Sequence, residues 1–152
     1  STVNREGTSF TLIDDSFNAN PDSMKAGLNG LKAWNSNDGK EPFRVALLGA
    51  MLELGADETA LHTSIGTYAD ELGIDAIIAV GSAQDQHLDA LAQALADGAR
   101  QSQSASVDCV HDIDAAEQLV IDLARNHPDA VVLLKGSHAS GLSALAERWA
   151  KN

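Results

Sequence analysis

Short apolar segments alternate along this chain with longer segments of helical period, and this alternation constrains the fold more than any other feature. The apolar segments predict strands over residues 8–13, 43–48, 76–80, 107–110 and 130–134. Apolar residues at helical spacing predict helices within residues 21–31, 61–72, 88–95, 113–123 and 142–149. Several strands are apolar on both faces, as in parallel sheets covered on both sides. We therefore expect an α/β fold, namely a doubly wound, mostly parallel open sheet with helices on both faces.

The size and charge of the chain exclude several classes of protein. A length of 152 residues suits one domain, so residues 1–152 are expected to form a single domain. The net charge of −12 repels polyanions, so we expect no nucleic acid partner and no membrane partner. The longest aliphatic runs have five residues, whereas a membrane-spanning helix needs about 20. The polar first residues and the single cysteine, Cys109, favour a cytoplasmic location.

Common signatures of nucleotide and metal sites are missing from the sequence. It contains neither the Gly-x-x-x-x-Gly-Lys-Ser/Thr pattern of a P-loop nor the Gly-x-Gly-x-x-Gly pattern of dinucleotide-binding domains. The five histidines are spread singly, so we expect no metal site and a surface or capping role for each histidine. Cys109 has no partner base in the sequence and is expected to be a small core residue.

Ligands of open parallel sheets bind beyond the carboxyl ends of the strands, so the residues after each predicted strand are candidates for a site. The first strand ends in the run Asp14-Asp15-Ser16-Phe17-Asn18-Ala19-Asn20-Pro21. Its carboxylates, hydroxyl and carboxamides can bind sugar hydroxyls, a cation or an ammonium group beside a helix N-terminus. The same run also fits an Asx-rich turn with Asn20 as a helix N-cap, and the pattern alone leaves both interpretations open.

Two further strand ends carry polar or glycine-rich segments. The last strand ends in Leu134-Lys135-Gly136-Ser137-His138, where Lys135, Ser137 and helix amides can hold a carboxylate or a phosphate. A solvated Lys135 with Ser137 as an N-cap is the open alternative. The second strand ends in Leu48-Gly49-Ala50-Met51-Leu52-Glu53-Leu54-Gly55, which suits either the lining of a pocket or a plain connection.

Taken together and in order, these strand ends resemble those of the C-terminal domain of the Mur ligases. The matching segments are Ile13 to Met24, Leu48 to Gly55, and Leu134 to Ser137. The first segment is long and specific, the second is moderately specific, and the third is weak by itself. Together they span nearly the whole chain. The run Asn18-Ala19-Asn20-Pro21-Asp22-Ser23-Met24 is similar to that of the branch that adds D-alanyl-D-alanine.

The resemblance implies a Rossmann-like domain that is the last of three in a longer ligase, after a UDP-binding domain and a central P-loop ATPase domain. Such ligases use ATP, with Mg²⁺, to phosphorylate the carboxylate of UDP-N-acetylmuramoyl-tripeptide. The amine of D-alanyl-D-alanine then attacks the acyl phosphate, which gives the pentapeptide precursor of peptidoglycan, ADP and phosphate. The domain closes over ATP and helps to hold the dipeptide. Alone it is expected to carry no catalytic residue, to bind no cofactor tightly and to be inactive.

The resemblance also assigns site residues. Asp15 would face the ribose of the nucleotide, with Asn18 and Asn20 nearby, whereas Lys135, Ser137 and His138 would hold the carboxylate of D-alanyl-D-alanine.

Three positions depart from the family pattern. Ala50 stands where these ligases commonly carry Asp, Phe17 where they usually carry Tyr, and His138 where Arg is frequent. The Phe17 ring can still pack or stack, but His138 lacks the permanent bidentate donor of Arg.

Two other classes of protein compete with the ligase interpretation. A receiver domain of signalling proteins also has an acidic pair after its first strand and a lysine after its last. It needs an acceptor Asp at the end of a middle strand, where this chain has Gly49-Ala50 and Gly81-Ser82. The other alternative is a nucleotide-binding module without catalysis.

Overall fold

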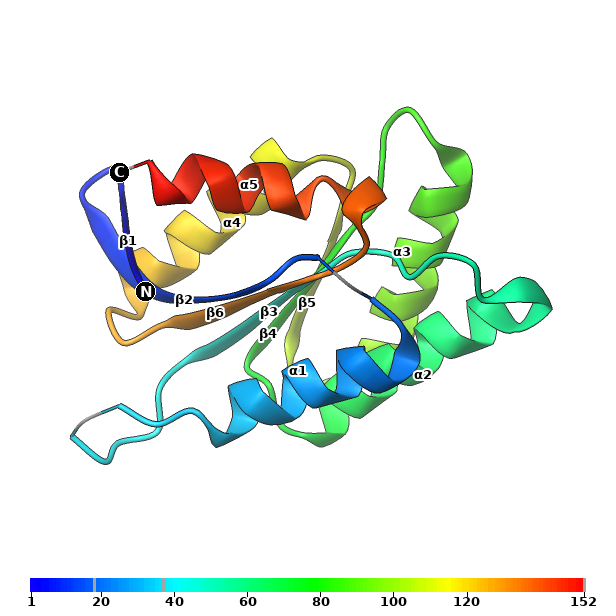
Figure 1. Cartoon of the computed structure of the whole chain (residues 1–152). Helices are drawn as coiled ribbons and strands as arrows, with labels where there is room; N and C mark the ends of the chain where they lie inside the picture. The colour runs from blue at the N-terminus through cyan, green and yellow to red at the C-terminus, as the bar shows by residue number, and fades with distance from the viewer. Residues whose placement is uncertain (18, 37, 152) are drawn as a thin grey trace.

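The computed structural model describes residues 1–17, 19–36 and 38–151, which form a six-stranded sheet with helices on both faces (Figure 1). The strands are β1 Thr2–Arg5, β2 Thr8–Asp15, β3 Arg44–Leu48, β4 Ala76–Val80, β5 Ser106–Val110 and β6 Val131–Lys135. The helices are α1 Pro21–Ala33, α2 Glu58–Glu71, α3 Gln86–Ala99, α4 Ile113–Asn126 and α5 Leu142–Ala150. Short 3-10 turns lie at Gly55–Asp57 and His138–Ser140.

The sheet has the strand order β1-β2-β6-β3-β4-β5, and every neighbouring pair except β1 and β2 is parallel. Helices α4 and α5 cover one face, and α1, α2 and α3 cover the other (Figure 1). This arrangement confirms the predicted doubly wound sheet. No helix in the described part of the chain is both long and apolar enough to cross a membrane.

The first strand, β1, was not predicted, because only Val3 of its four residues is buried and the segment shows no apolar run. It forms an antiparallel hairpin with β2 through the turn at Glu6 and Gly7. Both turn residues have positive φ, 50° and 74°, as two-residue hairpin turns with the twist of the sheet require. The Glu6-Gly7 pair directly before the strand at Thr8 is the sequence signal that could have indicated this hairpin turn.

The central strands are buried along their whole length. All residues of β3, β4 and β6 are buried, and they are apolar except for Arg44 at the start of β3 and Lys135 at the end of β6. On the α4 and α5 face, Trp149 packs edge-on against Phe10 of β2 with ring centroids 5.0 Å apart. This contact holds α5 against β2.

Glu117 of α4 is the centre of a buried polar cluster beneath α5. Its carboxylate accepts hydrogen bonds from Arg5 Nε at 3.0 Å, Arg148 Nη1 at 2.9 Å and Trp149 Nε1 at 2.6 Å. Burial alone would raise the pKa of this carboxyl group, but the hydrogen bonds from Trp149 and Arg148 and the charges of Arg5 and Arg148 outweigh burial and lower it. The cluster therefore ties β1, α4 and α5 together.

Helices α2 and α3 approach so closely that their backbones touch at two glycines. A Cβ on Gly66 would lie 1.9 Å from the carbonyl oxygen of Leu95, and a Cβ on Gly98 would lie 2.0 Å from that of Thr63. Neither position has room for a side chain, so the contact depends on glycine in both helices.

Candidate functional site

Three strands bring their carboxyl ends together at one edge of the sheet. In the register of the sheet, Asp15 at the end of β2 lies opposite Lys135 at the end of β6, and Lys135 lies opposite Leu48 at the end of β3. The chain then continues to α1 after β2 but to α5, on the other face, after β6. This change of face is the usual place for a ligand site in an open α/β sheet. Three of the strand ends that the sequence analysis selected as candidates therefore lie side by side.

Asp15 and Lys135, which the resemblance assigned to two different ligands, bind each other. Lys135 Nζ donates to Asp15 Oδ2 at 2.7 Å. The side chain of Lys135 is only 2% exposed, whereas that of Asp15 is 45% exposed. A Cβ on Gly27 of α1 would lie 3.3 Å from Lys135 Cδ, so the stem of the lysine packs against this helix. The buried cation is thus paired, and solvent reaches the pair from the side of the carboxylate.

Asn20 is the N-cap of α1. Its side-chain oxygen accepts from Ser23 N at 2.8 Å, and Ser23 Oγ accepts from Asn20 N at 3.0 Å, which completes a capping box. Asp14 Oδ1 accepts from Ser16 N at 3.1 Å, as in an Asx turn. The turn-and-cap interpretation of this run is therefore confirmed at Asp14 and Asn20. Asn18 lies outside the described residues.

Ser137 is held by its backbone, not by its side chain. Its N–H donates to the carbonyl of Ala50 at 3.0 Å. Within the described residues its buried hydroxyl has no hydrogen-bond partner. The alternative interpretation, a solvated Lys135 with Ser137 as an N-cap, is wrong, because Lys135 is buried and the 3-10 turn after Ser137 has no side-chain cap. A buried hydroxyl without a partner is an exception in folded proteins, which makes Ser137 a candidate for a role in binding.

His138 lies on the exposed rim beyond Ser137. Its Nδ1 is 3.5 Å from the hydroxyl of Ser143 in α5. Two large apolar side chains are also exposed beyond the strand ends, Phe17 at 76% and Leu52 at 38%.

The loop between β3 and α2 packs directly on the end of β6. Gly49 N donates to the carbonyl of Lys135 at 2.8 Å. A Cβ on Gly49 would lie 2.4 Å from Ser140 Cβ, so only glycine allows this approach. Glu53 in the same loop has a φ of 61°, a conformation that is strained for a residue with a side chain.

His62 of α2 supports this loop, and sequence analysis missed it. The side chain is fully buried, so the prediction of a surface or capping role for every histidine is wrong here. Its Nε2 accepts from Met51 N at 2.9 Å, and its Nδ1 lies 2.7 Å from the carbonyl of Glu58. The available signal was its spacing with Ile65 and Ala69, which places it on the buried stripe of the helix.

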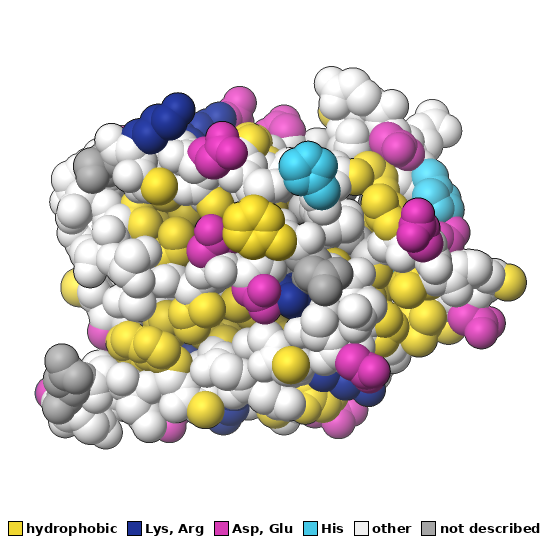
Figure 2. Space-filling view, in the orientation of Figure 1, with side chains coloured by type: hydrophobic (Ala, Val, Ile, Leu, Met, Phe, Trp, Pro, Cys, Tyr) yellow, Lys and Arg dark blue, Asp and Glu magenta, His cyan; other side chains and the backbone are white. Residues whose placement is uncertain are grey.

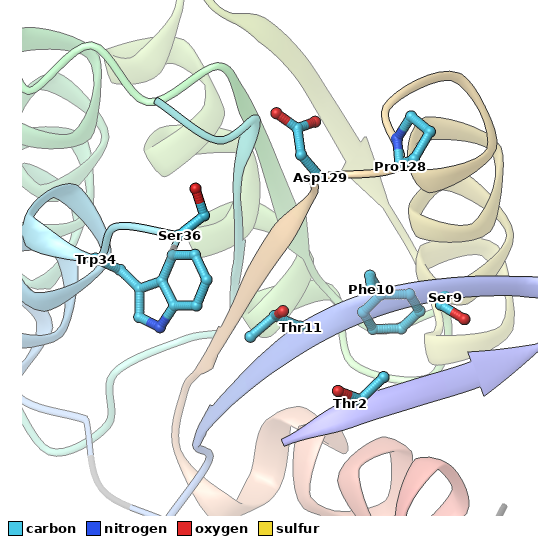
Figure 3. Close-up of a pocket in the computed structure, with 8 residues that line it drawn as sticks. All are labelled: Thr2, Ser9, Phe10, Thr11, Trp34, Ser36, Pro128 and Asp129. Carbon is cyan, nitrogen blue, oxygen red and sulfur yellow. The ribbon is translucent and has the colours of Figure 1, made fainter. Parts of the chain in front are cut away.

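Two other observations concern binding surfaces. A pocket of about 210 Å³ lies at the opposite end of the strands, where Trp34, Thr11 and Asp129 are among its lining residues (Figure 3). It contains none of the residues assigned by the resemblance. Acidic side chains are scattered over the face seen in Figure 2, whereas Lys and Arg appear at only a few places.

Comparisons with known proteins agree with this arrangement. The model of the family "Mur ligase, glutamate ligase domain" matches residues 2–138. The chain belongs to the Mur ligase family. This membership accounts for the order of the three strand-end segments and for their convergence at one edge.

Several relatives within the Mur ligase family are named UDP-N-acetylmuramoyl-tripeptide–D-alanyl-D-alanine ligase. The protein of Mycobacterium tuberculosis (strain CDC 1551 / Oshkosh) is 38% identical over 151 residues, which cover 95% of this chain and 29% of the relative. That of Escherichia coli (strain K12) is 40% identical over 70 residues, which cover 46% of this chain and 14% of the relative. The chain thus spans less than a third of the length of these ligases.

Solved structures of Mur ligases show the same fold. A crystal structure of MurF from Acinetobacter baumannii covers 100% of this chain and 30% of the MurF chain, with a TM-score of 0.73 and 25% identity. MurF ligase from Thermotoga maritima in complex with ADP covers 99% of this chain and 30% of the other, with a TM-score of 0.63 and 21% identity. The second likeness concerns the fold alone.

Proposed function

We propose that this chain is the C-terminal domain of a three-domain, ATP-dependent ligase that adds D-alanyl-D-alanine to UDP-N-acetylmuramoyl-tripeptide. The observation that carries the proposal is the match over 95% of the chain to a ligase of that name. The convergence of Asp15, Lys135 and Leu48 at one sheet edge supports it. The cytoplasm remains the predicted location.

In the proposed reaction, ATP transfers its terminal phosphoryl group to the carboxylate of the tripeptide and leaves as ADP. The amine of the dipeptide then attacks the carbonyl carbon of the acyl phosphate. The tetrahedral intermediate collapses to an amide and releases phosphate, and the amine loses its proton. This chain would bind and orient two substrates for these steps and would shield the acyl phosphate from water.

Asp15 is suited to hold the ribose of ATP. An ionised carboxylate offers roughly four acceptor positions, and Lys135 occupies one of them. The exposed side of Asp15 can therefore accept hydrogen bonds from two ribose hydroxyls while Lys135 holds the carboxylate in place. Asn20 is engaged as a helix cap, so its contribution would be to hold the α1 N-terminus in place next to Asp15.

The carboxylate of D-alanyl-D-alanine would bind beside Ser137 and Lys135. The hydroxyl of Ser137 is a donor for which the described residues supply no acceptor. Lys135 already binds Asp15, so a second carboxylate would share its ammonium group with Asp15. His138 lies on the rim of this position and would add a second donor when protonated.

The described residues also bear on Mg²⁺. Among residues 1–17, 19–36 and 38–151, no three His, Cys, Asp or Glu side chains gather as a metal site. We therefore propose that Mg²⁺ is held by the phosphates of ATP and by other parts of the longer ligase.

Steady-state kinetics of the longer ligase test the two assignments. Asp15→Ala is expected to raise the KM for ATP, and Lys135→Ala to raise the KM for D-alanyl-D-alanine, each by about tenfold or more, because a hydrogen bond to a charged group is lost. Lys40→Ala is the matched control, because Lys40 is exposed and precedes β3 at the opposite end of the sheet. Unchanged kinetics in either site variant would refute its assignment.

The 152-residue chain by itself provides a second test. Because it has no P-loop, it is expected to show no ATP hydrolysis and no ligation. Turnover of ATP by the purified chain, above that of a preparation carrying Asp15→Ala, would contradict the proposal that the catalytic groups lie elsewhere in the ligase.

A further inference from the structure

We propose that His62 is a positioning residue for the candidate site: as a neutral ring it fixes the loop over residues 49–54 against β6, and protonation of the ring releases that loop. The loop part of this inference stands on geometry alone. Its consequence for the affinity of the dipeptide rests on the proposed function.

The hydrogen bonds of His62 specify one tautomer. Met51 N carries a hydrogen and points it at Nε2, at 2.9 Å, so Nε2 must present a lone pair. The carbonyl oxygen of Glu58 can only accept, so Nδ1, at 2.7 Å, must carry the proton. His62 is therefore the neutral Nδ1–H tautomer, with both ring nitrogens engaged by backbone groups.

Protonation is incompatible with this arrangement. A proton on Nε2 would face the N–H of Met51 across 2.9 Å, with a hydrogen on each nitrogen. The ring is fully buried, so water cannot take over the lost contact. Burial lowers the pKa of His62, and the backbone and charge of Glu58 oppose this effect less strongly.

The charged groups near His62 partly cancel one another. Glu58, on the same helix, raises the pKa of His62, and His87, from α3, lowers it. Glu58 and His87 bind each other at 2.8 Å. From α1, Lys25 lies over the ring of Tyr68, which is six residues, or roughly 9 Å, further along α2. The ring therefore responds mainly to its burial and to the backbone.

The loop that His62 holds is bonded to both polar strand-end residues of β6. Gly49 N donates to the carbonyl of Lys135 at 2.8 Å, and Ser137 N donates to the carbonyl of Ala50 at 3.0 Å. Met51, the next residue, is anchored by His62. Glu53 then adopts a φ of 61°, which persists only where its surroundings hold it. Releasing Met51 would therefore loosen the backbone that positions Ser137.

Nuclear magnetic resonance of the purified chain between pH 7.5 and 5 tests the inference. We expect ¹⁵N shifts of the His62 ring to show the Nδ1–H tautomer and a pKa below 6.5. The amide signals of Met51 and Ser137 are expected to move with the same midpoint as the ring. A ring that titrates without these amides, or the opposite tautomer, would overturn the inference.

Variants separate positioning from packing. In His62→Gln, the side-chain oxygen can still accept from Met51, so the two amides should keep their protection from hydrogen exchange and lose their pH dependence. In His62→Ala, the protection factor of Met51 should fall about tenfold, because its N–H loses its acceptor. His111→Gln is the control, because His111 is an exposed histidine paired with Asp89 beyond β5. If neither variant folds, the titration of the unaltered chain still decides.

The consequence for binding is measured separately in the longer ligase. His62→Gln should remove the part of the pH dependence of the KM for D-alanyl-D-alanine that has the midpoint of the ring. If the Met51 and Ser137 amides follow His62 but this KM does not, the dipeptide site of the proposed function fails and the positioning of the loop stands. If the amides do not follow His62, the inference fails whatever the kinetics show.

Discussion

Two of the regions in which this molecule buries charged side chains differ in how completely the hydrogen bonds of those side chains and their neighbours are satisfied. Beneath α5, the carboxylate of Glu117 accepts from Arg5, Arg148 and Trp149, and Glu117 and Trp149 are both buried. At the sheet edge, Lys135 has Asp15 as its acceptor, and the hydroxyl of Ser137 nearby is unpartnered within the described residues.

The difference separates stability from function. A fully connected polar cluster contributes to the specificity and rigidity of the packing, and a ligand has nothing to add to it. An incompletely satisfied cluster is stable enough to persist, yet it gains hydrogen bonds when a ligand arrives. The edge with Asp15 and Lys135 is therefore the region that a substrate would complete.

The largest expected effect is the loss of stability in Glu117→Ala. This change removes the carboxylate that accepts from the buried indole N–H of Trp149 and from two arginines, so unfolding by denaturant should show a loss of about 3 kcal/mol. Asp114→Ala is the control, because Asp114 binds the same Arg148 from an exposed position and should cost less than about 1 kcal/mol. If the two variants lost equal unfolding free energy, the Glu117 cluster would not be the stabilising region that the comparison requires.

The same cluster should appear in the pH dependence of stability. The pKa of Glu117 lies below its ordinary value of 4.5 in the folded chain. Its contribution is therefore fully present well above pH 4.5 and is lost as the pH falls through 4.5 toward the folded-state pKa. Urea unfolding from pH 7 to 3 should show a smaller decline in Glu117→Gln than in the unaltered chain, and parallel curves would contradict this linkage.

An intermediate effect is expected at the sheet edge, where the two partners should respond differently. Asp15→Ala leaves the buried ammonium of Lys135 unpaired and should cost about 2 kcal/mol of unfolding free energy. Lys135→Met replaces a buried lysine by an apolar side chain of similar length, so the chain should stay within about 1 kcal/mol of its original stability or exceed it. If both variants lost the same amount of stability, the Asp15–Lys135 pair would have a structural role like that of the Glu117 cluster.

Much of the fold could be predicted from the sequence, because the central strands and the helices carry strong periodic signals. Hairpin strand β1 could not be predicted from apolar pattern, because Val3 is its single buried residue. The closure of the Glu117 cluster depends on Arg5, which is 112 residues away along the chain. No local pattern reports a contact of that separation.

The candidate site was predictable in its position and less so in its contacts. The topology of a parallel sheet is enough to bring Asp15 and Lys135 to one edge. Their direct pairing depends on the register of β2 and β6 and on the space that Gly27 of α1 leaves for the side chain of Lys135. Neither feature can be predicted from the sequences of the strand-end segments. The role of His62 was hidden for the same reason, because its partner is a backbone amide in another element.

The smallest expected effect concerns the rim of the site. Asn20→Ala removes the N-cap of α1 and should lower the unfolding free energy by about 1 kcal/mol. Asn35→Ala, at an exposed position after the same helix, is the control and should change stability by less than about 0.5 kcal/mol. If Asn20→Ala instead left stability unchanged and raised the KM for ATP in the longer ligase, Asn20 would be a nucleotide ligand and not a cap.

The glycine contact between α2 and α3 limits how this part of the chain can vary. At both Gly66 and Gly98 the obstacle to a larger residue is the backbone of the opposite helix, so no change of a neighbouring side chain can make room. A substitution at either glycine would have to separate two whole helices, one of which carries His62. We therefore expect glycine to be required at both positions, because no compensating side-chain substitution elsewhere can make room for a larger residue.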